Sequence, residues 1–243
     1  HVGWLGGYYN PKYFQRCDHS VGVTPDIVRF LRENGSWAVS RSHYLPTFAP
    51  QQQAAPVSRD LLETPPDVPL IVALGRLHPK KAFDILLQAM VQVPGAWLWL
   101  AGDGPLRGEL ERLCHVLGLD HRVRFLGWRD DREALIGAAD VVAMPSRYEP
   151  FGTVMIEAWA AHKPLVVAAA AGPSGLIRDG EDGLVVPLDD PPKLAGAIRR
   201  ILEDSALAQS LSDAGHAVWK EKFTEASVVR QYLQFYEQIG VTL

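Results

Sequence analysis

Residues 141–161 read VVAMPSRYEPFGTVMIEAWAA, and this stretch decides the fold. Its apolar start, residues 141–145, is typical of a buried strand in a parallel sheet. The Pro/Gly-rich turn that follows opens a helix, so unpaired backbone N–H groups at the helix start offer an anion site. Glu149 lies on the turn and Glu157 about one turn into the helix. We therefore expect the two carboxylates to contact different parts of one extended ligand.

Strands and helices alternate on both sides of this stretch. Apolar runs predict the strands, and residues with helical spacing follow most of them. We expect strands at residues 70–74, 97–101, 123–126, 141–144, 165–169 and 183–186, and helices at 83–93, 105–117, 132–138, around Glu157 and at 192–202. Short βα repeats imply an α/β fold, with a parallel sheet covered by helices on both faces. Ligands of such sheets bind at the carboxyl ends of the strands.

Composition divides the chain into four parts. Residues 1–50 contain turns, a short helix at 27–32 and a strand end, and residues 51–69 have the Gln- and Pro-rich composition of a linker. Residues 70–219 hold the βα repeat. Residues 220–243 hold a closing helix, which we expect to cross back to the N-terminal part.

Overall composition excludes several classes of protein. The 243 residues are 47% apolar with a net charge of −4, so a basic nucleic-acid-binding face is not expected. No apolar run approaches the length of a membrane span. Cys17 and Cys114 lie far apart, and neither they nor the histidines show metal-ligand spacing, so two free thiols in a reducing compartment are expected.

A basic turn follows the first strand of the repeat. Residues 75–84 read GRLHPKKAFD, which places Arg76 and Lys81 at the carboxyl edge of the sheet. The planar fork of Arg suits phosphate, and Lys adds a point charge. The alternative is a solvated basic turn without a ligand.

Two further turns are rich in small residues. Residues 102–108 read GDGPLRG and do not fit a dinucleotide fingerprint, because the third glycine comes one residue late and the expected carboxylate is missing. We expect a tight turn there and no NAD. Residues 168–175 read AAAAGPSG, which suits either a close approach of a ligand to the backbone or a simple turn, and the sequence leaves both open.

Together these motifs resemble the C-terminal half of retaining glycosyltransferases of family 4, which have the GT-B fold. The resemblance covers about residues 70–240, as far as the closing helix with Tyr232 and Tyr236. It rests on five motifs in order, which are GRL with Lys81 and Asp84, GDGP at 102–105, VRFLG at 123–127, EPFG with Glu157 and Ala158, and DGEDGLVVP at 179–187.

The resemblance implies a role for each site residue in binding a nucleotide-diphosphate sugar. It assigns the diphosphate to Arg76 and Lys81, and the ribose hydroxyls to Glu157. The residues that it places around the donor sugar and the base are Glu149, Phe151, Gly152, Thr153 and Gly127. Arg76, Lys81 and Glu149 are the expected catalytic groups, because cations and a helix start stabilise a leaving diphosphate and a carboxylate stabilises a cationic sugar ring. No metal and no further cofactor are implied.

The chain departs from the family pattern at three places. Ala82 stands where the family usually has Gly, and Gly175 where it usually has Glu. The N-terminal acceptor domain looks largely missing, because residues 1–50 resemble only its last portion and the chain starts without Met. We expect His1 near the end of a strand that faces the cleft.

The resemblance implies transfer of a hexose, with retention, to a glycan or glycolipid acceptor such as a bacterial lipopolysaccharide. It implies a cytoplasmic protein and allows peripheral association with the inner face of a membrane through the N-terminal half. Two alternatives stay open, a non-catalytic nucleotide-sugar-binding subunit that needs a partner chain and a sugar-nucleotide epimerase. The base, sugar, acceptor, linkage and oligomeric state are left undetermined.

Overall fold

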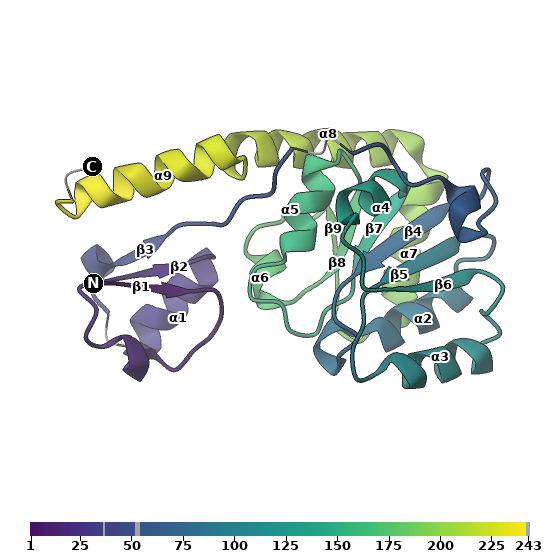
Figure 1. Ribbon diagram of the computed structural model, residues 1–243, viewed down its shortest axis with the longest axis horizontal. Helices are drawn as coiled ribbons and strands as arrows, with labels where there is room; N and C mark the ends of the chain where they lie inside the picture. The colour runs from purple at the N-terminus through teal and green to yellow at the C-terminus, as the bar shows by residue number, and fades with distance from the viewer. Residues whose placement is uncertain (36, 52–53, 242–243) are drawn as a thin grey trace.

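Two parallel sheets flanked by helices make up the computed structural model, which describes residues 1–35, 37–51 and 54–241 (Figure 1). The predicted α/β fold is confirmed. The smaller sheet has the order β1-β2-β3, and the larger has the order β6-β5-β4-β7-β8-β9. We call residues 1–44 the small unit and residues 70–222 the large unit.

The large unit contains the strands and helices that the sequence predicts, with ends that differ by at most two residues. Its strands are β4 (Leu70–Leu74), β5 (Trp97–Ala101), β6 (Val123–Gly127), β7 (Val141–Met144), β8 (Leu165–Ala168) and β9 (Leu184–Val186). Its helices are α2 (Phe83–Val91), α3 (Arg107–Val116), α4 (Arg132–Ala138), α5 (Thr153–Ala160), α6 (Ala171–Ser174), α7 (Pro191–Glu203) and α8 (Ser205–Lys222). Because β4 pairs with both β5 and β7, the strand order reverses at β4 and β7, and a ligand crevice is expected at their carboxyl ends.

Both faces of the large sheet are buried, as strictly parallel strands require. Along β4, the side chains of Ile71 and Ala73 join a core with α2, α3 and α7, and those of Leu70, Val72 and Leu74 join a core with α4 and α5. Successive side chains point to opposite faces of a strand, so a continuous apolar run fills both cores. The sheet is therefore a rigid platform for the loops at its edge.

The small unit is built from short elements. These are β1 (Val2–Leu5), η1 (Pro11–Phe14), β2 (His19–Gly22), α1 (Pro25–Gly35), η2 (Val39–Arg41) and β3 (Ser42–Tyr44). The side chain of Thr24 caps α1 by accepting a hydrogen bond from the N–H of Ile27 at 3.2 Å. The strand β1 was not predicted, because its four residues are too few to show a pattern.

The position predicted for His1 is wrong. The carboxyl end of β1 points to the large unit, where Gly7 lies against Pro150. His1 precedes the same strand, and its amino group is bound to Asp18 at 2.6 Å. His1 therefore lies at the opposite end of the strand from the large unit.

Two segments connect the units. The chain leaves β3 and runs beside the end of α8, where the N–H of Ala49 donates to Phe223 at 3.1 Å and the indole of Trp219 donates to Ala49 at 3.0 Å. The closing helix α9 (Glu225–Gln238) then extends over the small unit (Figure 1). Its Phe235 packs against Val21 and Leu45. The small sheet is thus covered by a helix from the other end of the chain.

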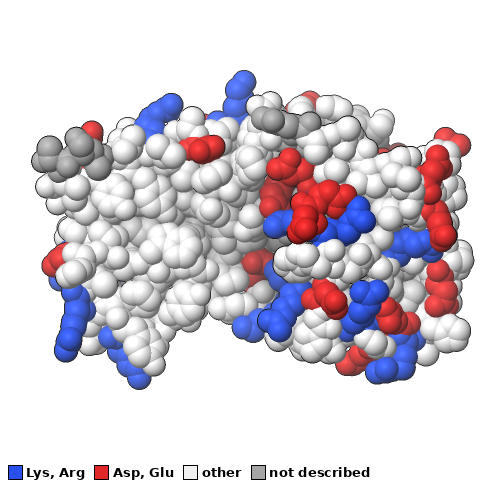
Figure 2. Space-filling view, in the orientation of Figure 1, with Lys and Arg blue, Asp and Glu red and all other residues white. Residues whose placement is uncertain are grey.

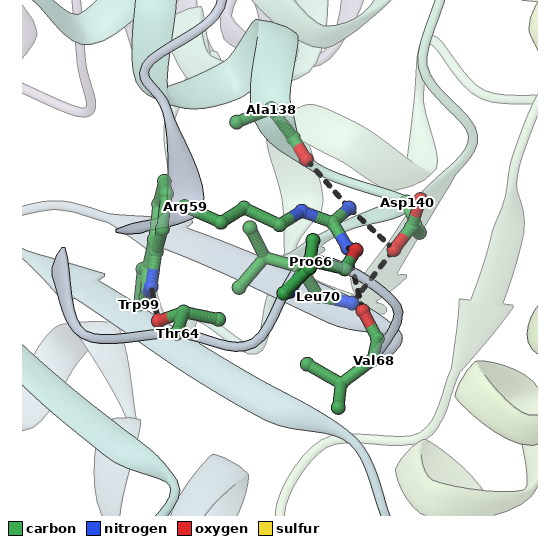
Figure 3. A network of polar contacts seen from close by, with 8 residues as sticks. All are labelled: Arg59, Thr64, Pro66, Val68, Leu70, Trp99, Ala138 and Asp140. Atoms are coloured by element: carbon green, nitrogen blue, oxygen red, sulfur yellow. Dashed lines mark hydrogen bonds and ion pairs between the residues drawn. The ribbon is translucent and has the colours of Figure 1, made fainter. Parts of the chain in front are cut away.

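The segment predicted as a linker is fastened to the large unit over its described residues from 54 onward. Arg59, in η3 (Arg59–Leu62), reaches beneath the amino ends of β4 and β7 (Figure 3). Its guanidinium donates to four oxygen atoms, those of Pro66 (2.9 Å), Val68 (2.6 Å), Ala138 (3.1 Å) and the carboxylate of Asp140 (2.9 Å). Asp140 in turn accepts from the N–H of Leu70 at 2.7 Å. Proline-rich composition therefore describes an extended segment here, and Arg59 fixes its path.

We predict that Arg59→Ala lowers the free energy of unfolding by about 2–3 kcal/mol, because it removes charge-assisted hydrogen bonds and leaves carbonyl groups without a donor. Urea denaturation measures the change. Arg107→Ala is the matched control, since the Arg107 guanidinium makes one ion pair with the described residues, an exposed i,i+4 pair with Glu111, and its loss should cost less than about 0.5 kcal/mol. Equal losses in the two variants would contradict the anchoring role.

Candidate functional site

A cavity of about 380 Å³ opens at the carboxyl ends of the central strands of the large sheet. It lies where the strand order reverses, as the topology predicts. Its wall holds more basic than acidic side chains, and its lining residues are Leu74, Gly75, Arg76, Lys81, Ala101, Gly102, Trp128, Arg129, Arg132, Glu149, Thr153 and Val154. The cavity is therefore suited to an anionic ligand.

The turn after β4 forms one side of the cavity. Gly102 lies so close to it that a methyl group on Gly102 would stand 1.9 Å from the carbonyl oxygen of Gly75, so only glycine fits. Arg76 is exposed and forms no hydrogen bond or ion pair with the residues that the structure describes. Its guanidinium is thus available to a ligand.

Lys81 and Glu149 form an ion pair across the cavity. Lys81 ends η4 (Pro79–Lys81), and Glu149 lies in the β7–α5 turn, where the hydroxyl of Ser146 donates to the same carboxylate at 3.5 Å. The side chain of Glu149 is only 11% exposed, so the charge has few water contacts. The Lys81 ammonium is therefore neutralised by Glu149, whereas Arg76 has no such partner among the described residues.

Arg147 fixes the geometry of this pair. Its guanidinium forms a two-pronged contact with Asp84, at 2.9 and 2.7 Å, and also binds Asp189 at 2.5 Å and the carbonyl of Pro79 at 3.0 Å. These hydrogen bonds, that to Asp84 first, raise the pKa of Arg147. The β7–α5 turn is thereby held against the turn that carries Lys81.

The start of α5 faces the cavity without a side-chain cap. Its N-cap residue is Gly152, with φ of +94°, and it offers no hydrogen-bonding side chain. Thr153 and Val154, in the first turn, line the cavity. Their free N–H groups and the helix dipole favour a negative group there. Phe151 points the other way, into the core against Phe223, so only its backbone is near the site.

Glu157 lies beside the cavity and not in its wall. It lines a neighbouring hollow together with Arg132, which borders both spaces. One oxygen of Glu157, Oε1, is paired with Arg132. The other, Oε2, is buried and has no hydrogen-bond partner among the described residues. A buried acceptor without a donor is unfavourable, so a ligand hydroxyl that reached Oε2 would stabilise the site.

After Gly127, which the sequence singled out, the β6–α4 loop supplies Trp128 and Arg129, which it did not. Gly127 accepts a hydrogen bond from the N–H of Gly102 at 2.7 Å, and the next side chain, Trp128, is 72% exposed while lining the cavity. Arg129 binds Asp131 at 2.8 and 2.5 Å, and this contact raises the pKa of Arg129. Trp128 could have been found from the sequence, because it is an aromatic residue directly after Gly127, at the carboxyl end of a predicted strand.

The small residues of 168–175 serve contact within the chain. The N–H of Gly172, in α6, donates to the carbonyl of Glu149 at 3.0 Å. A methyl group on Gly172 would lie 2.5 Å from the same oxygen. This contact between two backbone segments was not predicted, and it supports the turn of Glu149 from behind.

The predicted site residues therefore fall into three groups. Arg76, Lys81, Glu149 and Thr153 share one cavity, and Gly127 and Gly152 border it. Phe151 lies behind the cavity and Glu157 beside it. Among the described residues, no group of three or more His, Cys, Asp and Glu side chains is arranged to hold a metal ion. No described helix has both the length and the apolar composition that crossing a membrane requires.

Comparison with known proteins shows to which family this chain belongs. Residues 68–204 match the family described as Glycosyl transferases group 1. The chain is 36% identical over 234 residues to the lipopolysaccharide core biosynthesis glycosyltransferase LpsE of Rhizobium meliloti, covering 96% of this chain and 68% of LpsE. It is also 36% identical to LpsD of the same organism, covering 98% of this chain and 69% of LpsD. The chain belongs to the group 1 glycosyl transferase family.

Solved structures share the fold. A sucrose-phosphate synthase from Thermosynechococcus elongatus superposes with a TM-score of 0.85 at 31% identity, covering 94% of this chain and 60% of that chain. HepE of Anabaena, in complex with UDP-glucose, superposes with a TM-score of 0.88 at 24% identity, covering 97% of this chain and 71% of HepE. The large-unit architecture matches the GT-B type. The chain spans about two thirds of the length of these relatives.

We predict that Glu149→Gln binds pyrophosphate, used as an anionic probe of the cavity, about 3- to 10-fold more tightly, because Lys81 is freed and a charge that repels phosphate is removed. Isothermal titration at low salt measures the affinity, and the gain should shrink at high salt. Glu111→Gln, on the exposed face of α3, is the matched control and should change nothing. Weaker binding by Glu149→Gln would contradict the view that the Glu149 carboxylate opposes the binding of an anion.

A second prediction concerns Ala82, which adopts φ of +52° where glycine is favoured. Left-handed backbone costs Ala about 1–2 kcal/mol. Ala82→Gly relieves this strain but loses a fully buried methyl group, about 0.8 kcal/mol, and makes the unfolded chain more flexible. Its stability should therefore change by less than about 1 kcal/mol. Ala82→Val, which adds strain and volume, should lose more than about 2 kcal/mol by urea denaturation.

Proposed function

We propose that this group 1 glycosyltransferase is a retaining hexosyltransferase of family 4 and that the chain holds its nucleotide-sugar site. The observation that carries the proposal is the single cavity shared by free Arg76, the Lys81–Glu149 pair and the uncapped start of α5. The acceptor we propose is a bacterial glycan or glycolipid such as the lipopolysaccharide core. The names of LpsE and LpsD support this choice.

Each part of the donor finds matching chemistry in the site. Arg76 and the α5 start receive the diphosphate, and Lys81 joins them when the phosphate replaces Glu149 as its partner. The ribose hydroxyls donate to Glu157, whose Oε2 has no donor within the part of the chain that the structure describes. Trp128 offers an exposed ring beside the base. The UDP and UDP-glucose bound in the HepE structures make a nucleoside diphosphate sugar a reasonable donor class.

The reaction follows from the charges. The bond between the anomeric carbon and the β-phosphate oxygen breaks, which leaves positive charge on the sugar ring and negative charge on the diphosphate. Arg76, Lys81 and the helix start stabilise the diphosphate, and Glu149 stabilises the ring. The acceptor hydroxyl forms its bond to the anomeric carbon on the face that the diphosphate leaves. Its proton passes to the departing phosphate oxygen. Because the new bond forms on the face that the diphosphate leaves, the configuration is retained. Because Arg76, Lys81 and the helix start stabilise the diphosphate, no metal is needed.

The site lies in the half of the molecule that the matched region covers, and the remainder of the relatives' length lies outside this chain. Transfer by the whole protein is therefore proposed to need further structure that holds the acceptor. We place the protein in the cytoplasm, where nucleotide sugars are made, with peripheral contact to the inner face of a membrane as part of the proposal.

We predict that one of UDP, GDP and ADP binds the chain in EDTA, and that Arg76→Ala and Glu157→Ala each weaken it about 10-fold or more, equal to about 1.4 kcal/mol. Calorimetric titration measures the affinities and identifies the base. Arg230→Ala, which removes one charge from α9 far from the cavity, is the matched control. If the folded chain binds none of the three nucleotides, the donor site is refuted.

Turnover separates the proposed enzyme from the two alternatives. Release of nucleotide from the donor only when a sugar acceptor is added supports the transferase. Release of nucleotide and an altered sugar from the donor alone indicates an epimerase. If the chain alone binds the donor but releases no nucleotide, and release appears when the remaining length of the LpsE-type protein is added in trans, the result also supports a transferase. No release even then indicates a binding subunit.

A further inference from the structure

Two histidines of the small unit form a hydrogen-bonded pair on one face of the small sheet. His19 begins β2, and His43 lies within β3, opposite Val21 of β2. Successive side chains of a strand point to opposite faces, so the side chains of His19, Val21 and His43 share one face. Nδ1 of His19 and Nε2 of His43 stand 3.1 Å apart, and we call these two rings the imidazole pair.

The helix α9 closes over the imidazole pair (Figure 1). The ring centroid of Phe235 lies 4.8 Å from that of His43 and 6.2 Å from that of His19. Phe235 is only 4% exposed, and it also packs against Val21 and Leu45. Phe235 therefore ties the docking of α9 to the state of the two histidine rings.

Few other buried side chains hold α9 against the small sheet. Among the described residues, the buried side chains of this core are those of Val21, Leu45 and Phe235. Trp4 adds an exposed hydrogen bond, which its indole donates to the hydroxyl of Tyr232 at 3.0 Å. A contact with so little buried apolar area opens at a lower free energy than the cores of the large unit. A small change in its energy is therefore enough to undock the helix.

The hydrogen bond of the imidazole pair requires a neutral ring. A neutral imidazole has one N–H donor and one acceptor nitrogen, whereas an imidazolium has two donors and no acceptor. The pair therefore keeps its hydrogen bond when one ring is charged and loses it when both are. Two charged rings would also place like charges next to each other and against the apolar ring of Phe235. The docked position of α9 thus requires at least one neutral imidazole.

The charged groups of the small unit do not favour a second proton on the pair. Burial lowers the pKa of His43, and the charges of His19 and Arg32 add to this effect. Asp18 brings a carboxylate next to His19, but this carboxylate is exposed and is bound by the N-terminal amino group at 2.6 Å. The guanidinium of Arg41 also lies beside Asp18 and donates to its carbonyl at 2.6 Å. The charge of Asp18 is therefore already matched by cations.

The side of α9 that faces the pair is uncharged. A cavity of about 400 Å³ beside His43 is lined from α9 by Gln231, Gln234, Phe235 and Gln238. The charged residues of α9 are exposed and do not line this cavity, and they are Glu225, Arg230 and Glu237. Within the described length of α9, no acidic side chain is thus placed to offset a second proton.

The remaining groups around the pair are neutral as well. Burial raises the pKa of Tyr44, which lines the same cavity, and that of Tyr232, so both hydroxyls stay uncharged in acid. On the face shown in Figure 2, the broad area around the small unit and α9 carries few charged side chains. The imidazole pair is therefore the group at this contact whose charge changes in mild acid.

We propose that the imidazole pair is an acid-sensitive latch, which holds α9 on the small unit while at least one ring is neutral and releases it when both rings are protonated. Because α9 is one of the two segments that connect the units, the latch makes the hold of the large unit on the small unit depend on pH. The latch is independent of the proposed function, since it needs neither a nucleotide nor an acceptor.

The direction of the pH dependence follows from proton binding. Release of α9 exposes both rings to water, where each takes up a proton near the ordinary histidine pKa of about 6.5. In the docked state the pKa of His43 is lower. The docked state therefore binds fewer protons than the released state. Its stability is complete well above about pH 6.5 and falls as the pH is lowered through the pKa of docked His43.

Hydrogen exchange of the full chain, followed by mass spectrometry, tests the latch. The protection of amides in residues 228–238 is compared between about pH 7.5 and about pH 5, after correction for the intrinsic pH dependence of exchange. We expect the protection of α9 to fall about 10-fold or more in acid, while residues 208–219 of α8 keep theirs. The double variant His19→Gln with His43→Gln should lose this fall, because its amides form hydrogen bonds but take up no proton. His121→Gln, which replaces an exposed histidine of the large unit, is the matched control and should keep it.

Each outcome decides the latch. Unchanged protection of α9 in acid would overturn it. A fall that persists at full size in the double variant would overturn it too, because the titrating group would then lie elsewhere. If the double variant does not fold, His19→Gln takes its place, and the fall should shrink to less than about 3-fold because one imidazole cannot bring a second charge. A fall of full size in that variant, or an equal loss of protection in α8, would also overturn the latch.

Discussion

The bidentate contact between Arg147 and Asp84 is the interaction on which the site depends. Arg147 lies in the turn after β7 and Asp84 in the first turn of α2, and the same guanidinium reaches Asp189 before α7. Three loops from separate βα units are thereby drawn to one point of the sheet edge. Charge-assisted, two-pronged hydrogen bonds hold such a position more strictly than single contacts do. The placement of Lys81 against Glu149, and of Tyr148 toward the small unit, follows from this point.

The charged side chains of the site are paired unevenly. Lys81 is paired with Glu149 and Arg132 with Glu157, whereas Arg76 has no partner among the residues described. Anion binding can therefore begin at Arg76 and at the α5 start, and continue as phosphate takes Lys81 from Glu149. In the proposed function, the carboxylate that is released stabilises the positive charge that develops on the sugar. The Lys81–Glu149 ion pair and the proposed catalytic charges thus involve the same groups.

Much of the large unit could be predicted because its signals are local. Continuous apolar runs such as 70–74 and 141–144 mark strands buried on both faces, and Pro or Gly marks the turns between them. Arg76, Lys81, Glu149 and Thr153 follow strand ends, so the parallel topology brings them to one edge. His1 was misplaced because a strand of four residues gives no pattern to orient it. Arg59 was missed because its partners are mainly backbone carbonyls, which no side-chain motif records.

The sequence by itself determined the α/β alternation, the family resemblance and the set of charged residues at the carboxyl edge, because each depends on neighbours along the chain. Only the tertiary structure decided which charges pair. Glu149 meets Lys81, 68 positions away, and Glu157 meets Arg132, 25 positions away. It also decided that Tyr8 faces Tyr148 and that Phe235 of α9 packs against Val21 and Leu45. The physical reason is that these contacts depend on how separate loops and helices pack, and packing is a property of the whole fold.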